Sequence, residues 1–213
     1  MTTPDLTAAE IVVTDQELAR AAAVIGGGGV VAFPTETFYG LAVDPSNAAA
    51  LDRLFRLKKR SPDKPVLVLI DEIATLSELV SEIPDNYRKL MDQFWPGPLT
   101  LVFPGRARLH GQLVDSDHTV GVRLSSHPLA RRLAGAAGGT ITGTSANPSA
   151  LPAAVTADQV QEMFPAGIDY IVDGGRVPGG TGSTIVGLEA GELKLIRPGI
   201  ISYREIVAAV VAG

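Results

Sequence analysis

The sequence VVAFPTETFYGLAVD, residues 30–44, joins a buried-strand pattern to a group of small polar side chains. Apolar residues lead into Pro34, polar and aromatic residues follow, and Gly40 lets the chain return to apolar residues. The apolar run predicts a strand in the core. Thr35, Glu36 and Thr37 are then either the polar end of that strand or the rim of a binding site.

The composition favours a single α/β domain. Of the 213 residues, 46% are hydrophobic but only 5% are aromatic, and the chain contains 23 glycines and 15 prolines. An aliphatic core interrupted by many turns is typical of α/β proteins, and one core can grow to this length. We expect residues 1–213 to form one domain without a C-terminal extension.

Charge and residue types argue against several classes of protein. The net charge of −5 disfavours nucleic-acid binding by bulk electrostatics, although six of the 18 Lys and Arg residues lie between Arg53 and Lys64. The lack of cysteine excludes a disulfide framework and suits a reducing compartment. Neither a signal peptide nor an apolar run of the ~20 residues that a membrane helix needs is present. We therefore expect a cytoplasmic protein with no membrane contact.

Start and stop signals predict helices that alternate with strands. Thr14 and Glu17 have the spacing of a capping box, and either Ser46 or Asn47 begins a second helix. A hairpin is expected to turn at residues 190–191. The other predicted strands are 30–35, 65–70, 99–103, 119–124, 140–144 and 168–175, and the other helices are 84–95, 127–139, 156–164 and 202–212. This order predicts a twisted sheet of mixed parallel and antiparallel strands, flanked by helices.

Two basic residues in RLKKRSPDKP, Lys58 and Arg60, are candidates for binding phosphate. Pro62 and Pro65 make the exit of the preceding helix rigid, so the two cations do not simply follow one helical face. Cations there either complement the helix dipole or grip phosphates, Arg through its planar fork and Lys as a point charge.

Other polar residues stand at predicted strand ends. Arg123 ends an apolar strand, where a buried charge would need a partner, and a strand-end arginine that reaches water is an equal alternative. Ser145 and Asn147 in TGTSANPSA, and Ser183 and Arg197 beside glycines, follow other strands. Such groups serve turns or a ligand, because open α/β sheets bind ligands at strand ends.

Several familiar motifs are absent. The glycines at 26–29 lie between a helix and a strand, whereas a phosphate loop runs from a strand to a helix and carries a Lys-Ser or Lys-Thr pair. No motif of a zinc hydrolase, serine hydrolase or dinucleotide enzyme occurs, and no metal-ligand set is predicted. His127, directly before Pro128, is interpreted as a helix-entry residue because no acidic residue lies nearby in the sequence.

Six segments resemble the YrdC-type threonylcarbamoyl-AMP synthases in order and in rough spacing. They are GGVVAFPTETFYGLAVD, LKKRSPDKP, FWPGPLTLVF, VGVRLSSHP, TSANPSA, and GSTIV followed by LIRPG. The resemblance covers about residues 30–202. It implies a twisted mixed sheet with a large concave basic cavity. It also implies an enzyme that makes threonylcarbamoyl-AMP and pyrophosphate from L-threonine, bicarbonate or CO2, and ATP, the first step of threonylcarbamoyladenosine formation in tRNAs that read codons beginning with A.

The resemblance also implies roles for single residues. Lys58 and Arg60 would grip the ATP phosphates, and Arg123 would pair with the carboxylate of threonine. Ser145 and Asn147 would complete the catalytic group at the nucleotide phosphate and its metal environment. The remaining implied contacts are Thr35 and Ser183 with threonine, and Thr119 and Arg197 with the nucleotide. Replacing Lys58 or Arg60 by alanine is expected to abolish adenylate formation and to leave the fold intact.

The implied cofactor and partners follow from this reaction. Mg²⁺ would arrive with ATP, a separate threonylcarbamoyl-transferase complex would use the product, and tRNA contact would be weak. Leu69 stands where some members have a substrate-contacting histidine, so no histidine is assigned to threonine. Two alternatives remain: a double-stranded RNA or tRNA-binding module without catalysis, and a carbamoyl-transfer domain like those of hydrogenase-maturation proteins.

Overall fold

Residues 12–211, the part of the chain that the computed structural model describes, contain ten strands and seven α-helices. The strands are β1 (Val31–Pro34), β2 (Tyr39–Ala42), β3 (Val68–Ile70), β4 (Leu99–Pro104), β5 (Thr119–Leu124), β6 (Thr140–Thr142), β7 (Thr144–Ser145), β8 (Tyr170–Ile171), β9 (Thr184–Glu189) and β10 (Glu192–Arg197). The helices are α1 (Asp15–Gly26), α2 (Ala48–Lys58), α3 (Leu76–Leu79), α4 (Asp85–Phe94), α5 (Pro128–Ala136), α6 (Ala157–Met163) and α7 (Tyr203–Val211), and a 3-10 turn, η1 (Ile73–Thr75), precedes α3.

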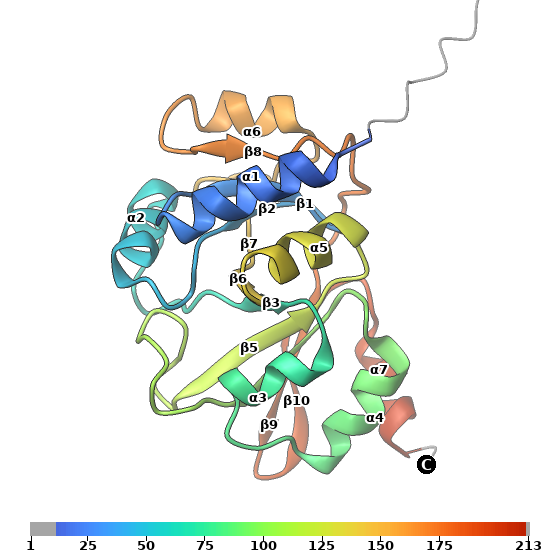
Figure 1. Ribbon diagram of the computed structural model, residues 1–213. Coiled ribbons are helices and arrows are strands. Elements are labelled where there is room, and N and C mark those ends of the chain that lie inside the picture. Colours follow the sequence, from blue (N-terminus) through green and yellow to red (C-terminus); the bar gives the residue numbers. More distant parts are fainter. Residues whose placement is uncertain (1–11, 212–213) are drawn as a thin grey trace, which may run out of the picture.

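The strands divide between two sheets. A four-stranded sheet has the order β7-β2-β1-β8, and a six-stranded sheet has the order β10-β9-β4-β5-β3-β6. In Figure 1 the four-stranded sheet lies in the upper part of the molecule and the six-stranded sheet below it. Each sheet contains parallel and antiparallel pairs. The mixed α/β architecture predicted from the sequence is therefore confirmed, and the strands form two sheets rather than one.

Local capping starts the helices where the sequence predicts. Thr14 Oγ1 accepts a hydrogen bond from the Glu17 amide at 3.2 Å, and Glu17 Oε2 accepts one from the Thr14 amide at 2.8 Å, which completes the predicted capping box. Asn47, rather than Ser46, caps α2 by accepting from the Ala50 amide at 3.1 Å. These bonds satisfy amides that the first helical turn leaves without partners.

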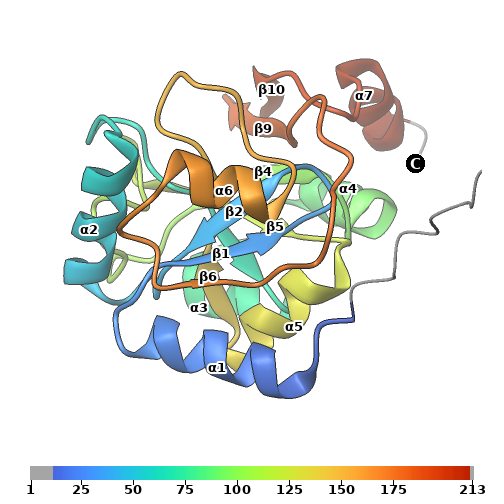
Figure 2. The same cartoon turned by 90° about the horizontal axis from the view of Figure 1, so that it is seen from above.

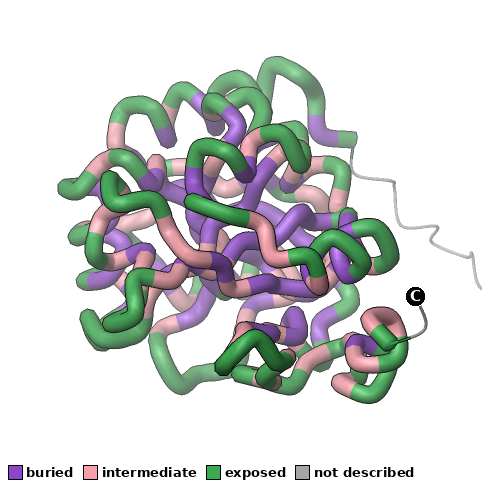
Figure 3. Tube along the Cα trace, turned by 90° about the horizontal axis from the view of Figure 1, so that it is seen from below, coloured by how far each residue is buried: buried purple, intermediate pink, exposed green. Residues whose placement is uncertain are grey.

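The helices cover the sheets and bury two groups of aliphatic side chains. Helices α1 and α5 lie side by side (Figure 2), and Leu18, Ile25 and Leu133 pack there against Phe33 of β1. The larger group joins α2, α4 and α7 to both sheets through side chains such as Leu54. Figure 3 shows these buried segments in purple running through the middle of the molecule. Among the helices of residues 12–211, none combines the length and apolar character needed to cross a membrane.

A single residue carries the chain from one sheet to the other. The predicted strand 140–144 is split, with Thr142 in the six-stranded sheet, Thr144 in the four-stranded sheet and Gly143 between them. The Gly143 amide donates to the Leu67 carbonyl at 2.9 Å, which anchors the crossover to the segment before β3. The short elements η1 and α3 were not predicted from the sequence.

Candidate functional site

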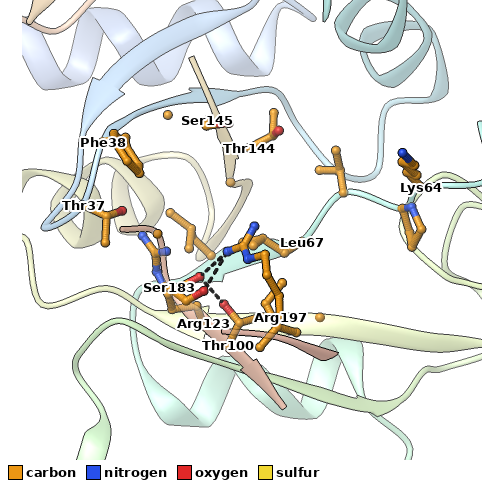
Figure 4. A pocket seen from close by; sticks show the side chains of 18 of the residues that line it. Thr37, Phe38, Lys64, Leu67, Thr100, Arg123, Thr144, Ser145, Ser183 and Arg197 are labelled. Carbon is orange, nitrogen blue, oxygen red and sulfur yellow. Dashed lines mark hydrogen bonds between the residues drawn. The ribbon is translucent and has the colours of Figure 1, made fainter. Parts of the chain in front are cut away.

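A hollow of about 880 Å³ has walls from both sheets. The six-stranded sheet contributes residues of β3, β4, β5, β9 and β10, and the four-stranded sheet contributes residues of β1, β2 and β7. Figure 4 shows Arg123, Ser183 and Arg197 gathered on one side of the hollow, and Thr144 and Ser145 across from them. The charged residues on the lining are Arg60, Asp63, Lys64, Asp115, Arg123 and Arg197.

The structure brings together most of the residues predicted from the sequence. Seven of the nine line the hollow, and the two that do not are Lys58 and Asn147. The seven are Thr35, Arg60, Thr119, Arg123, Ser145, Ser183 and Arg197. They come from segments far apart in the sequence, so their convergence is a property of the fold.

The turn after β1 forms part of the rim. Thr35 Oγ1 donates to the Phe38 carbonyl at 2.7 Å, and the Phe38 carbonyl also accepts from the Thr35 amide at 3.1 Å. The hydroxyl oxygens of Thr35 and Thr37 lie 3.0 Å apart, and both residues line the hollow. The polar run after Pro34 therefore ends a strand and also forms a cavity wall, which answers the question raised by the sequence.

Lys58 lies behind the wall and ties two segments together. It is the last residue of α2, is only 2% exposed, and donates through Nζ to the backbone carbonyls of Ser145 and of Asn147, the latter at 2.6 Å. The Ser149 amide donates back to the Lys58 carbonyl at 2.9 Å. Burial, followed by the nearby Arg60 charge, lowers the pKa of Lys58 to about 7. Lys58 therefore holds the loop that presents Ser145.

Arg60 leaves the helix in another direction and reaches the hollow. Lys59 ends α2 in the left-handed conformation, with φ of 50°, and this turn separates the paths of Lys58 and Arg60. Arg60 Nε donates to the Lys64 carbonyl at 2.7 Å, and Nη2 donates to the Pro65 carbonyl at 2.9 Å. Burial and the charge of Arg197 lower the pKa of Arg60. Because arginine keeps its proton in proteins, Arg60 remains a cation.

Ser145 and Asn147 are linked within their loop. Ser145 Oγ donates to Asn147 Oδ1 at 2.5 Å, and Asn147 Nδ2 donates to the Leu151 carbonyl. Ser145 is exposed and lines the hollow, whereas Asn147 is only 9% exposed and does not. Asn147 thus orients the serine hydroxyl from behind.

Arg123 is a buried cation that faces the hollow. It is 6% exposed, and its Nε lies 3.5 Å from Glu36 Oε1. Burial lowers its pKa and the Glu36 carboxylate opposes this effect. Glu36, which in turn accepts a hydrogen bond from Ser125 Oγ, was not assigned a role from the sequence. The available signal was that a buried arginine needs a carboxylate partner.

His127 begins α5, as predicted, but an acidic residue does lie near it in space. Its Nδ1 accepts a hydrogen bond from the Leu129 amide at 3.3 Å, as a helix cap does. Burial lowers the pKa of His127, and the charge of Glu36 partly opposes that effect. The absence of an acidic neighbour therefore holds for the sequence and not for the structure.

Ser183 and Arg197 form a network with a third residue, Thr100. Arg197 Nη2 donates to the Ser183 carbonyl at 2.8 Å and to Ser183 Oγ at 3.0 Å, and Thr100 Oγ1 lies 2.9 Å from Ser183 Oγ (Figure 4). Burial and the charge of Arg123 lower the pKa of Arg197. Thr100 was missed because a threonine inside a strand pattern carries no sign of which way it faces.

The hollow suits a ligand with several negative groups. Its lining carries four cations against two carboxylates, and Asp115 is engaged by the amide and hydroxyl of Thr119, both at 2.8 Å. Within residues 12–211, no group of three or more His, Cys, Asp or Glu side chains is placed to hold a metal ion. Charge-assisted bonds from arginine favour carboxylate and phosphate oxygens.

Comparison with known proteins gives consistent matches. The sequence profile of the Sua5/YciO/YrdC family, described as "Telomere recombination", matches residues 23–199. A threonylcarbamoyl-AMP synthase of Bacillus subtilis is 36% identical over 202 residues, which cover 94% of this chain and 58% of that protein. One of Thiobacillus denitrificans is 39% identical over 78% of this chain and 88% of its own length.

Solved structures share the fold. The crystal structure of Pyrococcus abyssi Sua5 complexed with L-threonine matches with a TM-score of 0.89 and 35% identity, over 94% of this chain and 59% of that one. Escherichia coli YciO matches with a TM-score of 0.80 and 21% identity, over 89% of this chain and 92% of that one. The chain spans 58% and 55% of the lengths of the first two curated relatives.

Proposed function

Because the chain belongs to the Sua5/YciO/YrdC family, we propose that it makes threonylcarbamoyl-AMP from L-threonine, bicarbonate or CO2, and ATP. The observation that carries this proposal is the convergence of Arg60, Arg123 and Arg197 on one hollow. A hollow of about 880 Å³ is within the range of small-molecule sites. The similarity to the P. abyssi Sua5 complex with L-threonine supports the choice of amino acid.

We assign the amino-acid end of the hollow to Arg123. Its guanidinium suits the α-carboxylate of threonine, because a planar fork matches a carboxylate with two parallel hydrogen bonds. Thr35 and Ser183 line the same hollow and offer hydroxyl groups for the rest of the amino acid. Leu69 also lines it and offers no polar group to the amino acid.

The phosphate end is assigned to Arg60 and Arg197, with Ser145 on the opposite wall and Thr119 nearer to the rest of the nucleotide. Lys58 and Asn147 serve this end indirectly, since both hold the loop of Ser145 from behind. The lining oxygen groups, among them Ser145 and the carboxylates Asp63 and Asp115, fit an Mg²⁺ ion that keeps phosphate and water ligands rather than a protein cage. Bound Mg²⁺ would supply neutralisation of phosphate charge.

The site would act by positioning and charge balance. The threonine amine attacks carbon dioxide and loses a proton to give a carbamate. A carbamate oxygen then attacks the α-phosphorus, and the bond to pyrophosphate breaks. Holding the reactants in contact removes much of the entropic cost of these encounters, and fixed cations stabilise the charge that moves onto the leaving pyrophosphate. No covalent bond to the protein is required.

The test is a reaction with purified protein. Incubation with ATP, labelled bicarbonate and one amino acid at a time should release pyrophosphate and form a labelled adenylate with L-threonine. Equal turnover with every amino acid, or none with threonine, would contradict the proposal. Binding of double-stranded RNA with steep salt dependence and no turnover would instead favour the binding module. We further propose that a separate transferase consumes the product and that tRNA contact is weak.

A further inference from the structure

Glu36 stands directly behind the wall of the hollow. It lies between Thr35 and Thr37, which both line the hollow, but Glu36 is not itself part of the lining. Its side chain is 14% exposed and accepts a hydrogen bond from Ser125 Oγ. The turn after β1 thus places two threonines on the lining and keeps Glu36 off it.

The guanidinium of Arg123 has one enclosed side and one open side. Its Nε is buried without a hydrogen bond and lies 3.5 Å from Glu36 Oε1, which is likewise enclosed. The two terminal nitrogens have no hydrogen-bond partner within residues 12–211 and are not among the enclosed atoms. Arg123 itself lines the hollow. The open side is therefore available to a ligand, and Glu36 occupies the other.

Charge repulsion makes this arrangement dependent on Glu36. Arg123 lies close enough to Arg197 to lower its pKa, and Arg197 acts in the same way on Arg60. Within residues 12–211, Arg123 is the one cation on the lining that forms an ion pair with a carboxylate. Removing the carboxylate would leave a buried, unpaired guanidinium beside another cation, which is an unfavourable position.

We propose that Glu36 is a positioning residue that orients Arg123 toward the α-carboxylate of the amino-acid substrate and so separates the amino-acid end of the hollow from its phosphate end. This inference rests on the proposed function. Glu36 acts through Arg123 and does not touch the substrate. Ser125 contributes to the same positioning, because its hydroxyl donates a hydrogen bond to the Glu36 carboxylate.

Two opposite effects distinguish this role from a merely structural one. Glu36→Gln keeps the shape of the side chain and removes its charge. Threonine binding should weaken about tenfold or more, because Arg123 loses its orientation. Binding of a triphosphate should stay equal or become tighter, because the hollow becomes more positive. A general loss of structure would weaken both ligands together.

The experiment measures dissociation constants without turnover. L-threonine, and separately a non-hydrolysable ATP analogue with Mg²⁺, are titrated calorimetrically into the wild type and the Glu36→Gln and Ser125→Ala variants. Glu162→Gln is the matched control, because it makes the same charge change on an exposed residue of α6 outside the lining. The expected result is weaker threonine binding in both site variants, larger for Glu36→Gln, with analogue binding retained.

The other outcomes decide between the positioning role and its alternatives. Unchanged threonine binding in Glu36→Gln, or equal weakening of both ligands, overturns the positioning role. Should Glu36→Gln fail to fold, Ser125→Ala decides, because an unchanged threonine affinity there contradicts the inference. A wild type that binds neither threonine nor the analogue refutes the proposed function instead. Recovery of threonine binding in Glu36→Asp, relative to Glu36→Gln, would show that the charge is what matters.

Discussion

Lys58 and Arg123 are both buried cations near the same hollow, but they are held in different ways. Lys58 Nζ donates to two backbone carbonyls and is absent from the lining. The Arg123 side chain makes no hydrogen bond within residues 12–211, has Glu36 on one side and faces the hollow on the other. A cation that donates its hydrogen bonds within the protein stabilises the fold, whereas a cation with free donors that face a cavity is available to a ligand.

The largest effect is expected from Lys58→Met. The Asn147 carbonyl would be left without a donor, at a cost of about 1–3 kcal/mol, whereas the Ser145 carbonyl would keep the Asn147 amide, which donates to it at 3.0 Å. Both the free energy of unfolding and the rate of adenylate formation should therefore fall, in contrast with the sequence-based expectation of an intact fold. Urea denaturation and pyrophosphate release measure the two quantities. Lys59→Met, on the exposed neighbour, is the control. If Lys58→Met lost activity but kept the stability of the wild type, Lys58 would instead have a direct role in binding the phosphates.

Arg123→Met should separate the effects on the two substrates. Threonine binding loses its carboxylate partner, so kcat/KM for threonine should fall about 100-fold or more, which is the order expected for truncating one member of a buried charge pair. The KM for ATP should change far less. The unfolding free energy should also fall, because removing Arg123 leaves the buried Glu36 carboxylate without its partner, so the difference between the two substrates carries the test. Steady-state kinetics with each substrate varied in turn, beside urea denaturation, checks both statements; equal effects on the two substrates would indicate a structural role.

The pH dependence of stability provides a smaller test of Lys58. Its pKa is lowered to about 7, whereas an unfolded lysine titrates near 10.4. Between these values the unfolded chain binds more protons, so the free energy of unfolding of the wild type should rise with pH relative to Lys58→Met. The limiting slope is about 1.4 kcal/mol per pH unit. Denaturation curves from pH 6 to 10 test this, and a flat difference would show that Lys58 stays charged in the folded protein.

The smallest effect is expected at an exposed cation. Arg88 pairs with Asp85 at 3.7 Å, and the side chain of Arg88 is 63% exposed. Such pairs contribute about 0–1 kcal/mol, so Arg88→Ala should lower the unfolding free energy by no more than that and leave adenylate formation unchanged. A larger loss would mean that burial does not explain the contrast between Lys58 and Arg123.

Much of the fold was predictable because it depends on local signals. The capping box at Thr14, the start of α2 and the hairpin at residues 190–191 follow from neighbouring residues alone. The division into two sheets was not predictable, since strand pairing depends on contacts between distant segments. The split at Gly143 looked like one continuous strand in the sequence.

The site was predictable as a set of residue types and less so as an arrangement. Sequence motifs brought Arg60, Arg123 and Arg197 to attention, and the structure places them on one hollow. The direction in which each side chain points is set by packing, which the sequence does not show. Lys58, predicted to bind phosphate, lies behind the wall. Glu36, which was assigned no role from the sequence, pairs with Arg123.

Gly143, the single residue between β6 and β7, limits how far apart the two sheets can lie at this point. One residue joins β6 to β7, and the Cα atoms of adjacent residues are about 3.8 Å apart. A Cβ atom at this position would lie 2.6 Å from Leu69 Cγ and 2.8 Å from Leu67 Cδ1, so any side chain would have to displace these two leucines. An inserted residue would reverse the alternation of the following strand and turn the hydroxyl of Ser145 to the opposite face. Deletions and insertions here should therefore be tolerated far less than in the loop after Ser149.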